Sequence, residues 1–116
     1  MIRTVSFLRV ALFLLSLILL PAGSLYAQKK KQFTVVLDAG HGGYDPGAVY
    51  GNVKEKDINL TVTKMLAEKI KEMYPEIKVI LTRSTDVFVE VHDRSNIAHK
   101  ANADLFLSIH ANAAES

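Results

Sequence analysis

Three short apolar runs, separated by segments with helical periodicity, constrain the fold of this chain more than any other feature. The runs cover residues 33–37, 77–81 and 105–109 and are rich in β-branched and aromatic residues, which favour strands. Nearly continuous apolar runs are typical of strands buried on both faces of a parallel sheet. Because the links are long enough for helical crossovers, the sequence predicts an α/β fold. We expect an open, mostly parallel sheet of three strands, with two helices that cover both of its faces.

Two helices and one loop are expected between these strands. The first helix is predicted over residues 57–74, with Asp57 as its N-cap and Pro75 as its stop, and the second over residues 90–102. Residues 39–56 are predicted to form a glycine-rich loop. The spacing predicts that the apolar residues of both helices face the sheet, namely Ile58, Val62, Met65, Leu66, Met73, Val91, Ile97, Ala98 and Ala101.

The third strand lies close to the end of the sequence. Seven residues follow residue 109, since the chain has 116, and they are too few to cover a strand that is buried on both faces. We therefore expect residues 33–116 to be a domain that lacks its C-terminal part.

Residues 1–27 have the layout of a secretory signal peptide. Arg3 and Arg9 precede an apolar run over residues 10–20, and Pro21 breaks this run ahead of Ala27. The run is shorter than the ~20 residues that a membrane-spanning helix needs. We therefore expect cleavage and export, to the periplasm or outside the cell, with no stable membrane anchor afterwards. Residues 28–32 would then form a short basic leader.

Charge and cysteine content exclude several classes of function. The chain has 14 basic and 12 acidic residues, and removal of Arg3 and Arg9 with the signal peptide leaves 12 of each. The mature chain therefore has no excess of positive charge that would indicate a nucleic-acid partner. With no cysteine, it has no disulfide, no thiolate metal ligand and no cysteine nucleophile.

Two histidines follow predicted strands directly. His41 comes just after the first strand and His110 just after the third, and the carboxyl ends of parallel strands meet at one edge of a sheet. Glu55 lies at the far end of the glycine-rich loop, where the next helix returns to that edge. Two histidines and a carboxylate are a common ligand set of hydrolytic zinc sites. The alternatives are two ordinary loop histidines, or Asp57 in place of Glu55 as the third ligand.

Two more carboxylates lie near His41 in the sequence. Asp38 is expected either to orient His41 by a hydrogen bond or simply to end the strand. Asp45, which precedes Pro46, is expected to be a turn residue.

The remaining charged candidates are two arginines and two histidines. Arg83 and Arg94 are expected either to bind a carboxylate of a substrate or to form surface salt bridges. His92 and His99 are seven residues apart on the second helix, too far apart for one ion, and are expected to be solvated or packed.

Four motifs, in order, resemble those of the zinc-dependent N-acetylmuramoyl-L-alanine amidases of the amidase-3 type. The first covers residues 35–48 (Val-Val-Leu-Asp-Ala-Gly-His-Gly-Gly-Tyr-Asp-Pro-Gly-Ala) and the second residues 54–60 (Lys-Glu-Lys-Asp-Ile-Asn-Leu). Leu-Thr-Arg at 81–83 and Ala-Asp-Leu-Phe-Leu-Ser-Ile-His-Ala-Asn at 103–112 are the third and fourth. The resemblance extends over about residues 33–113.

The resemblance implies both a site and a substrate. It makes His41, Glu55 and His110 the protein ligands of a catalytic Zn²⁺. Further candidates, as residues that contact substrate or support the ligands, are Asp38, Arg83, Arg94 and Asn112. The implied reaction is hydrolysis of the amide between N-acetylmuramic acid and L-alanine in peptidoglycan, for degradation or remodelling of the cell wall. An activator protein would be a further partner.

The resemblance also implies a missing group. The general base of the family is a glutamate late in the domain, expected beyond Ser116, and Glu115 lies too close to His110 to take that role. The chain as written is therefore expected to be inactive by itself. The alternative function is a non-catalytic or degenerate exported domain that binds peptidoglycan.

Overall fold

The computed structural model describes residues 31–112 of the chain. The predicted signal peptide, residues 28–30 of the predicted leader and Glu115 lie outside this part. Within residues 31–112, no helix has both the length and the apolar character needed to cross a membrane.

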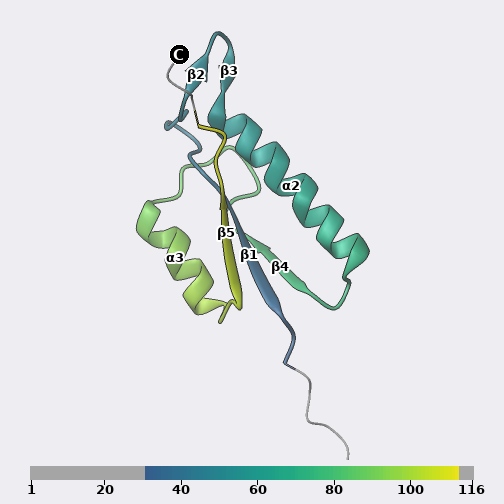
Figure 1. Ribbon diagram of the computed structural model, residues 1–116. Coiled ribbons are helices and arrows are strands. Elements are labelled where there is room, and N and C mark those ends of the chain that lie inside the picture. The colour runs from purple at the N-terminus through teal and green to yellow at the C-terminus, as the bar shows by residue number, and fades with distance from the viewer. Residues whose placement is uncertain (1–30, 113–116) are drawn as a thin grey trace, which may run out of the picture. The chain divides into compact units, whose positions relative to one another are not determined.

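A central strand organises the sheet. Strand β1 (Thr34–Ala39) lies between β4 (Lys78–Leu81) and β5 (Leu105–Ile109), and both neighbours run parallel to it. Figure 1 shows the three strands side by side, with β1 in the middle. All six residues of β1 are buried, as expected for a β-branched run covered on both faces. The predicted parallel order is confirmed.

The two helices lie on opposite faces of this sheet. Helix α2 (Glu55–Met73) covers one face and α3 (Val91–Lys100) lies against the other (Figure 1). Under α2 the core consists of Val35, Leu37 and Ala67, with partly buried Leu66, Ile70, Ile77, Val79 and Leu81 around them. The α/β fold with helices on both faces is therefore confirmed.

Helix α2 begins two residues earlier than the sequence predicts. Its N-cap is Lys54, and Asp57 lies inside the first turn, exposed to solvent. The prediction of Asp57 as N-cap is therefore wrong. Together with Glu55, Asp57 still places negative charge at the positive end of the helix dipole.

The predicted inward face of α2 is also wrong in part. Ile58, Val62, Met65 and Met73 are 40%, 44%, 64% and 55% exposed. The residues that α2 buries beyond its first turn are Asn59, Thr63 and Ala67. The first half of the helix thus turns a polar face to the sheet, because Asn59 is hydrogen bonded to the backbone just after β1. Further along, the predicted Leu66 is partly buried against the core.

Helix α3 shows the same effect. Val91 is 80% exposed, against the prediction, whereas Arg94 is the residue of this helix that is buried. Ile97, Ala98 and Ala101 are half-buried, as expected for an inward face.

Strand β5 does not have the two-sided burial that its sequence predicts. Leu105, Phe106 and Leu107 are 47%, 40% and 41% exposed. Within residues 31–112, β5 is an edge strand that pairs with β1 alone. Among the described residues, burial on both faces is therefore found for β1 and not for β5.

The glycine-rich loop contains a hairpin that the sequence analysis missed. Strands β2 (Val49–Tyr50) and β3 (Val53–Lys54) pair antiparallel around a two-residue turn. Gly51 in this turn has φ of 59°, a conformation that glycine adopts at little cost. The hairpin leads directly into α2, and the Glu55 N–H donates to the Ala48 carbonyl at 2.8 Å. It thereby places Glu55 beside the end of β1.

Candidate metal centre

Three side chains predicted from the sequence as metal ligands lie together at one edge of the sheet. His41 follows β1, His110 follows β5, and Glu55 is the first residue of α2. One ligand atom from each lies within 4.8 Å of the ligand atoms of the other two. Because β1 and β5 are parallel neighbours, their carboxyl ends carry the two histidines to the same place.

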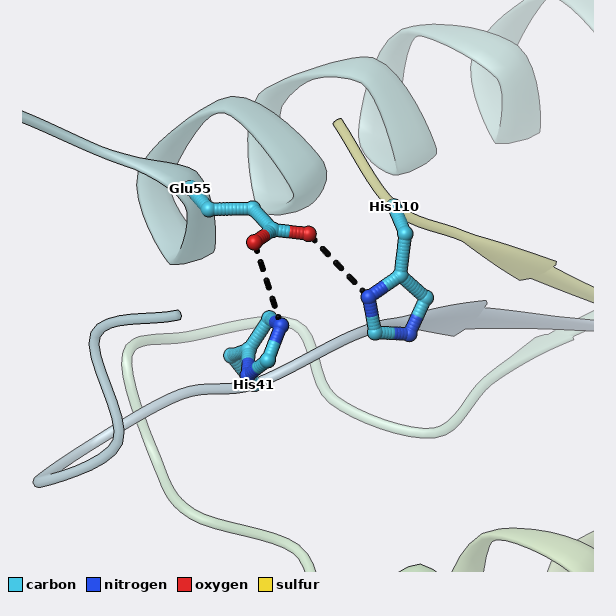
Figure 2. Close-up of side chains that lie close together, drawn as sticks. All are labelled: His41, Glu55 and His110. Atoms are coloured by element: carbon cyan, nitrogen blue, oxygen red, sulfur yellow. Dashed lines mark hydrogen bonds and ion pairs between the residues drawn. The ribbon is translucent and has the colours of Figure 1, made fainter. Parts of the chain in front are cut away.

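Glu55 lies between the two imidazole rings. Its Oε2 is 3.2 Å from Nε2 of His41, and its Oε1 is 3.1 Å from Nδ1 of His110. Figure 2 shows the carboxylate pointing at both rings. The rings themselves meet edge to face, with centroids 4.9 Å apart.

The surrounding backbone keeps Glu55 ionised. Its side chain is 4% exposed, and this burial by itself would raise the pKa. Hydrogen bonds from the N–H groups of Ala48 and Asn112, together with those from Asn59 and His110, outweigh that effect and lower the pKa from 4.5 to about 2. Glu55 is therefore a fixed anion, as a metal-binding carboxylate must be.

Asp45 orients His41. Its Oδ2 lies 2.8 Å from Nδ1 of His41, while its Oδ1 accepts a hydrogen bond from the Gly47 N–H at 3.1 Å. The hydrogen bond from His41 lowers the pKa of the Asp45 carboxyl, which is thus an acceptor only. Nδ1 of His41 must then carry a proton, and this leaves Nε2 as the nitrogen available to a cation. The expected turn role of Asp45 is confirmed. The sequence analysis missed its contact with His41, although the two residues are only four positions apart.

With this tautomer, a cation is needed between His41 and Glu55. In a neutral His41 ring the lone pair of Nε2 faces the anionic Glu55 Oε2 at 3.2 Å. Two electron-rich atoms at that distance require a proton or a metal ion between them. Two imidazole nitrogens and one carboxylate are a donor set that zinc prefers. The residues present therefore fit a Zn²⁺ ion with three protein ligands.

Glycines make room for this cluster. A Cβ added at Gly47, which has φ of 64°, would lie 2.6 Å from Cδ2 of His41 and 2.8 Å from Oε2 of Glu55. Only a residue without a side chain fits there, so the loop can pass directly behind two of the three candidate ligands.

Asp38 does not contact His41. Its carboxylate accepts hydrogen bonds from Thr82, Arg94 and Ser108 at 2.6, 2.8 and 2.6 Å. Of the two roles considered for Asp38, orientation of His41 is therefore excluded, because Asp45 has that contact. Asp38 instead connects β1 to α3 and to β5.

The two candidate arginines are buried. Arg83 and Arg94 are 3% and 7% exposed, so the expectation of surface salt bridges is wrong. Their guanidinium groups donate mainly to backbone carbonyls of residues 39–41, and Arg94 also pairs with Asp38. They thus support the turn that carries His41.

The other candidates differ in their distance from the centre. The N–H of Asn112 donates to Glu55 Oε1 at 3.2 Å, so Asn112 borders the cluster. Asp57 is exposed and is not one of the clustered ligands. His92 and His99 are exposed on α3, which confirms that they are solvated.

Two cavities adjoin the cluster. One of about 400 Å³ is lined by both histidines together with Asp45, Arg94, Phe88 and Phe106. The other, of about 300 Å³, is lined by Glu55 with Val49, Tyr50, Ile58, Ala111 and Asn112. The candidate ligands are therefore accessible from two hollows.

Residues 35–116 match the family model described as N-acetylmuramoyl-L-alanine amidase. Two curated relatives illustrate the similarity. The endolysin of Bacillus phage SPP1 is 51% identical over 79 residues, which are 68% of this chain and 29% of that protein. The sporulation-specific N-acetylmuramoyl-L-alanine amidase of Bacillus subtilis is 38% identical over 78 residues, which are 67% of this chain and 31% of that protein.

Solved structures agree with the sequence relatives. The amidase AmiC2 of Nostoc punctiforme superposes with a TM-score of 0.68 at 41% identity, over 73% of this chain and 47% of that one. The N-acetylmuramoyl-L-alanine amidase of Clostridium difficile 630 gives 0.67 at 38% identity, over 72% and 46%. The chain thus spans less than a third of these curated relatives and about half of these solved chains. On this match, the chain belongs to the N-acetylmuramoyl-L-alanine amidase family.

Proposed function

We propose that His41, Glu55 and His110 bind a zinc ion and that the centre serves hydrolysis of the amide between N-acetylmuramic acid and L-alanine in peptidoglycan. The observation that carries the proposal is the cluster itself. Three ligand atoms within 4.8 Å of one another lie on a chain of the amidase family. Export to the cell wall, which the N-terminal sequence predicts, would bring the chain to this substrate.

Each residue of the cluster has a definable part in this function. Glu55 supplies a charge that is already ionised at neutral pH, and Asp45 presents Nε2 of His41 as the ligating atom. When bound, zinc supplies Lewis acidity and makes water a nucleophile near neutral pH. The two adjoining cavities offer space for the two arms of a substrate that extends to either side of its scissile amide.

No residue in 31–112 is assigned as the general base. The two carboxylates that contact the histidines are both occupied by other partners. Glu55 contacts both rings, and Asp45 contacts His41 and the Gly47 N–H. A base must be free to accept a proton from water. We propose that this group lies outside the described residues, as the family resemblance implies.

The metal is tested on the purified full chain. We expect about one zinc ion per chain, measured by atomic emission after dialysis, and loss of the metal in His41→Ala and His110→Ala. The matched controls are His92→Ala and His99→Ala, which remove exposed histidines of α3 and should keep the zinc. Equal zinc in all four variants would refute the ligand assignment.

The reaction is tested on purified peptidoglycan, with a form of the chain that also carries the general base proposed above. An amidase exposes new N-terminal L-alanine, and this release should stop with a chelator and resume with zinc. Zinc binding together with retention on sacculi, but without released amine, would instead support the alternative of a non-catalytic peptidoglycan-binding domain.

A further inference from the structure

Two buried guanidinium groups hold the turn that carries His41. The carbonyl of Ala39 accepts hydrogen bonds from Nε of Arg83 and from Nη1 of Arg94, both at 2.8 Å. The next carbonyl, of Gly40, accepts from Arg83 at 3.0 Å, and that of His41 accepts from Arg94 at 2.9 Å. Three consecutive carbonyls therefore point at the two arginines, and His41 is left in a left-handed conformation with φ of 62°.

A single nitrogen of Arg83 contacts two segments that carry candidate ligands. Its Nη2 donates to the Gly40 carbonyl at 3.0 Å and to the Lys56 carbonyl at 2.8 Å. Gly40 directly precedes His41, and Lys56 directly follows Glu55. One atom thus connects the backbone next to one candidate ligand to the backbone next to the other.

The chemistry of this contact suits arginine alone. Within residues 31–112, Arg83 donates to the carbonyls of Ala39, Gly40, Lys56 and Thr85. A rigid planar fork with five N–H groups can reach four carbonyls at once, whereas a lysine ammonium on a flexible stem cannot hold them in one plane. Burying a guanidinium without a hydrogen-bonded carboxylate is costly, so its presence is better explained by the geometry it imposes than by stability.

We propose that Arg83 is a positioning residue that sets the spacing between His41 and Glu55 in the metal centre. The inference rests on the proposed zinc site, because the spacing matters only if both residues bind one ion. Arg83 touches neither ring nor the Glu55 carboxylate in any hydrogen bond described within residues 31–112, so it acts through the backbone.

The test compares metal binding by the full wild-type chain with that of Arg83→Lys and Arg83→Gln. Cobalt(II) is the probe, because its visible absorption spectrum reports coordination geometry. The dissociation constant is measured by competition with a chromophoric chelator. Ala67→Gly is the matched control, since it weakens the buried face of α2 without touching either ligand segment. Thermal melts identify any variant that fails to fold.

We expect both Arg83 variants to bind cobalt roughly 10–100-fold more weakly, with an altered spectrum, while Ala67→Gly keeps the wild-type spectrum and affinity. A wild-type spectrum and affinity in either folded Arg83 variant would overturn the inference. Equal changes in Ala67→Gly and the Arg83 variants would also overturn it, since the effect would then follow from stability alone. A wild-type chain that binds no metal would instead refute the proposed zinc site, and the inference with it.

Discussion

Gly40 lies directly against the imidazole ring of His110. A Cβ added at Gly40 would overlap this ring and would lie 2.7 Å from its Nδ1, the atom that faces Glu55. The absence of a side chain at the end of β1 thus defines where the ring after β5 can lie.

Substitution of this glycine should therefore disturb both the candidate metal centre and the fold. We expect Gly40→Ala to push the His110 ring away from Glu55, to weaken zinc binding by roughly tenfold or more and to cost about 2 kcal/mol of stability through overpacking. Zinc affinity by competition titration and stability by urea unfolding measure the two effects.

The hairpin offers a matched control for this variant. Gly51 has φ of 59° and nothing within 4 Å of an added Cβ. Gly51→Ala should cost about 1 kcal/mol of backbone strain and leave zinc binding unchanged. If the two alanine variants lose zinc affinity equally, contact between Gly40 and His110 is not the cause.

Asp45→Asn tests the orientation of His41. Asparagine keeps an oxygen that can accept from the Gly47 N–H, but it replaces the anionic partner of Nδ1 at 2.8 Å. We expect zinc affinity to fall roughly tenfold or more, with the turn and the melting temperature little changed. Asp57→Asn removes a carboxylate from the exposed first turn of α2 and serves as the control. Unchanged affinity in Asp45→Asn would show that the hydrogen bond does not orient the ring.

The sequence predicted the architecture because the pattern that defines it is local. The β-branched run of β1 and the crossover lengths are visible in the chain itself, and the histidines at the strand ends follow from the parallel order. The position of Glu55 just before the next helix predicted it as the third candidate ligand. These inferences needed only the rule that parallel strands end at one edge.

The orientation of α2 could not be predicted in the same way. Hydrophobic periodicity assumes that the apolar stripe faces the core, but α2 buries Asn59 and Thr63 and exposes Met65. Asn59 is buried because it donates to the Gly40 carbonyl and to Glu55, so the site rather than the core sets this part of the helix. The burial of the two arginines was not predicted for a similar reason, since most of their partners are backbone carbonyls, whose positions the sequence does not reveal.

Because of Asp38, the free energy of unfolding should depend on pH in the acid range. Burial raises the pKa of this carboxyl, but hydrogen bonds from Ser108, Thr82 and Arg94 outweigh burial and bring it below the ordinary 3.8. A carboxyl with a depressed folded-state pKa stabilises the native state above its unfolded-state pKa. That stabilisation is lost as pH falls from about 3.8 through the lower folded-state value.

The Asp38→Asn variant separates this effect from general acid denaturation. At pH 7 it should lose about 3 kcal/mol, because Arg94 is left as a buried charge without its partner. The difference from wild type should shrink as the pH falls through the folded-state pKa. Urea unfolding between pH 7 and pH 2.5 measures this difference in the free energy of unfolding, with the exposed Asp93→Asn as the control. A difference that stays constant with pH would contradict the assigned ionisation.

Zinc should stabilise the folded chain by mass action. The three candidate ligands come together only in the native arrangement, so free zinc at 100 times its dissociation constant should add about 2.7 kcal/mol to the free energy of unfolding. A chelator should reverse the rise in melting temperature, and His41→Ala should show none. An equal rise in His41→Ala would place the bound zinc elsewhere.

The positions of the three candidate ligands also set the order of events during synthesis. His41 and His110 are separated by 69 positions (110 − 41), and they meet only when β5 has added to the free edge of β1. A nascent chain that has exposed everything up to α3 already has His41 and Glu55 but no third ligand. Capture of zinc by all three residues would therefore require that β5 has docked, and the rate of zinc uptake by a refolding chain would report when it docks.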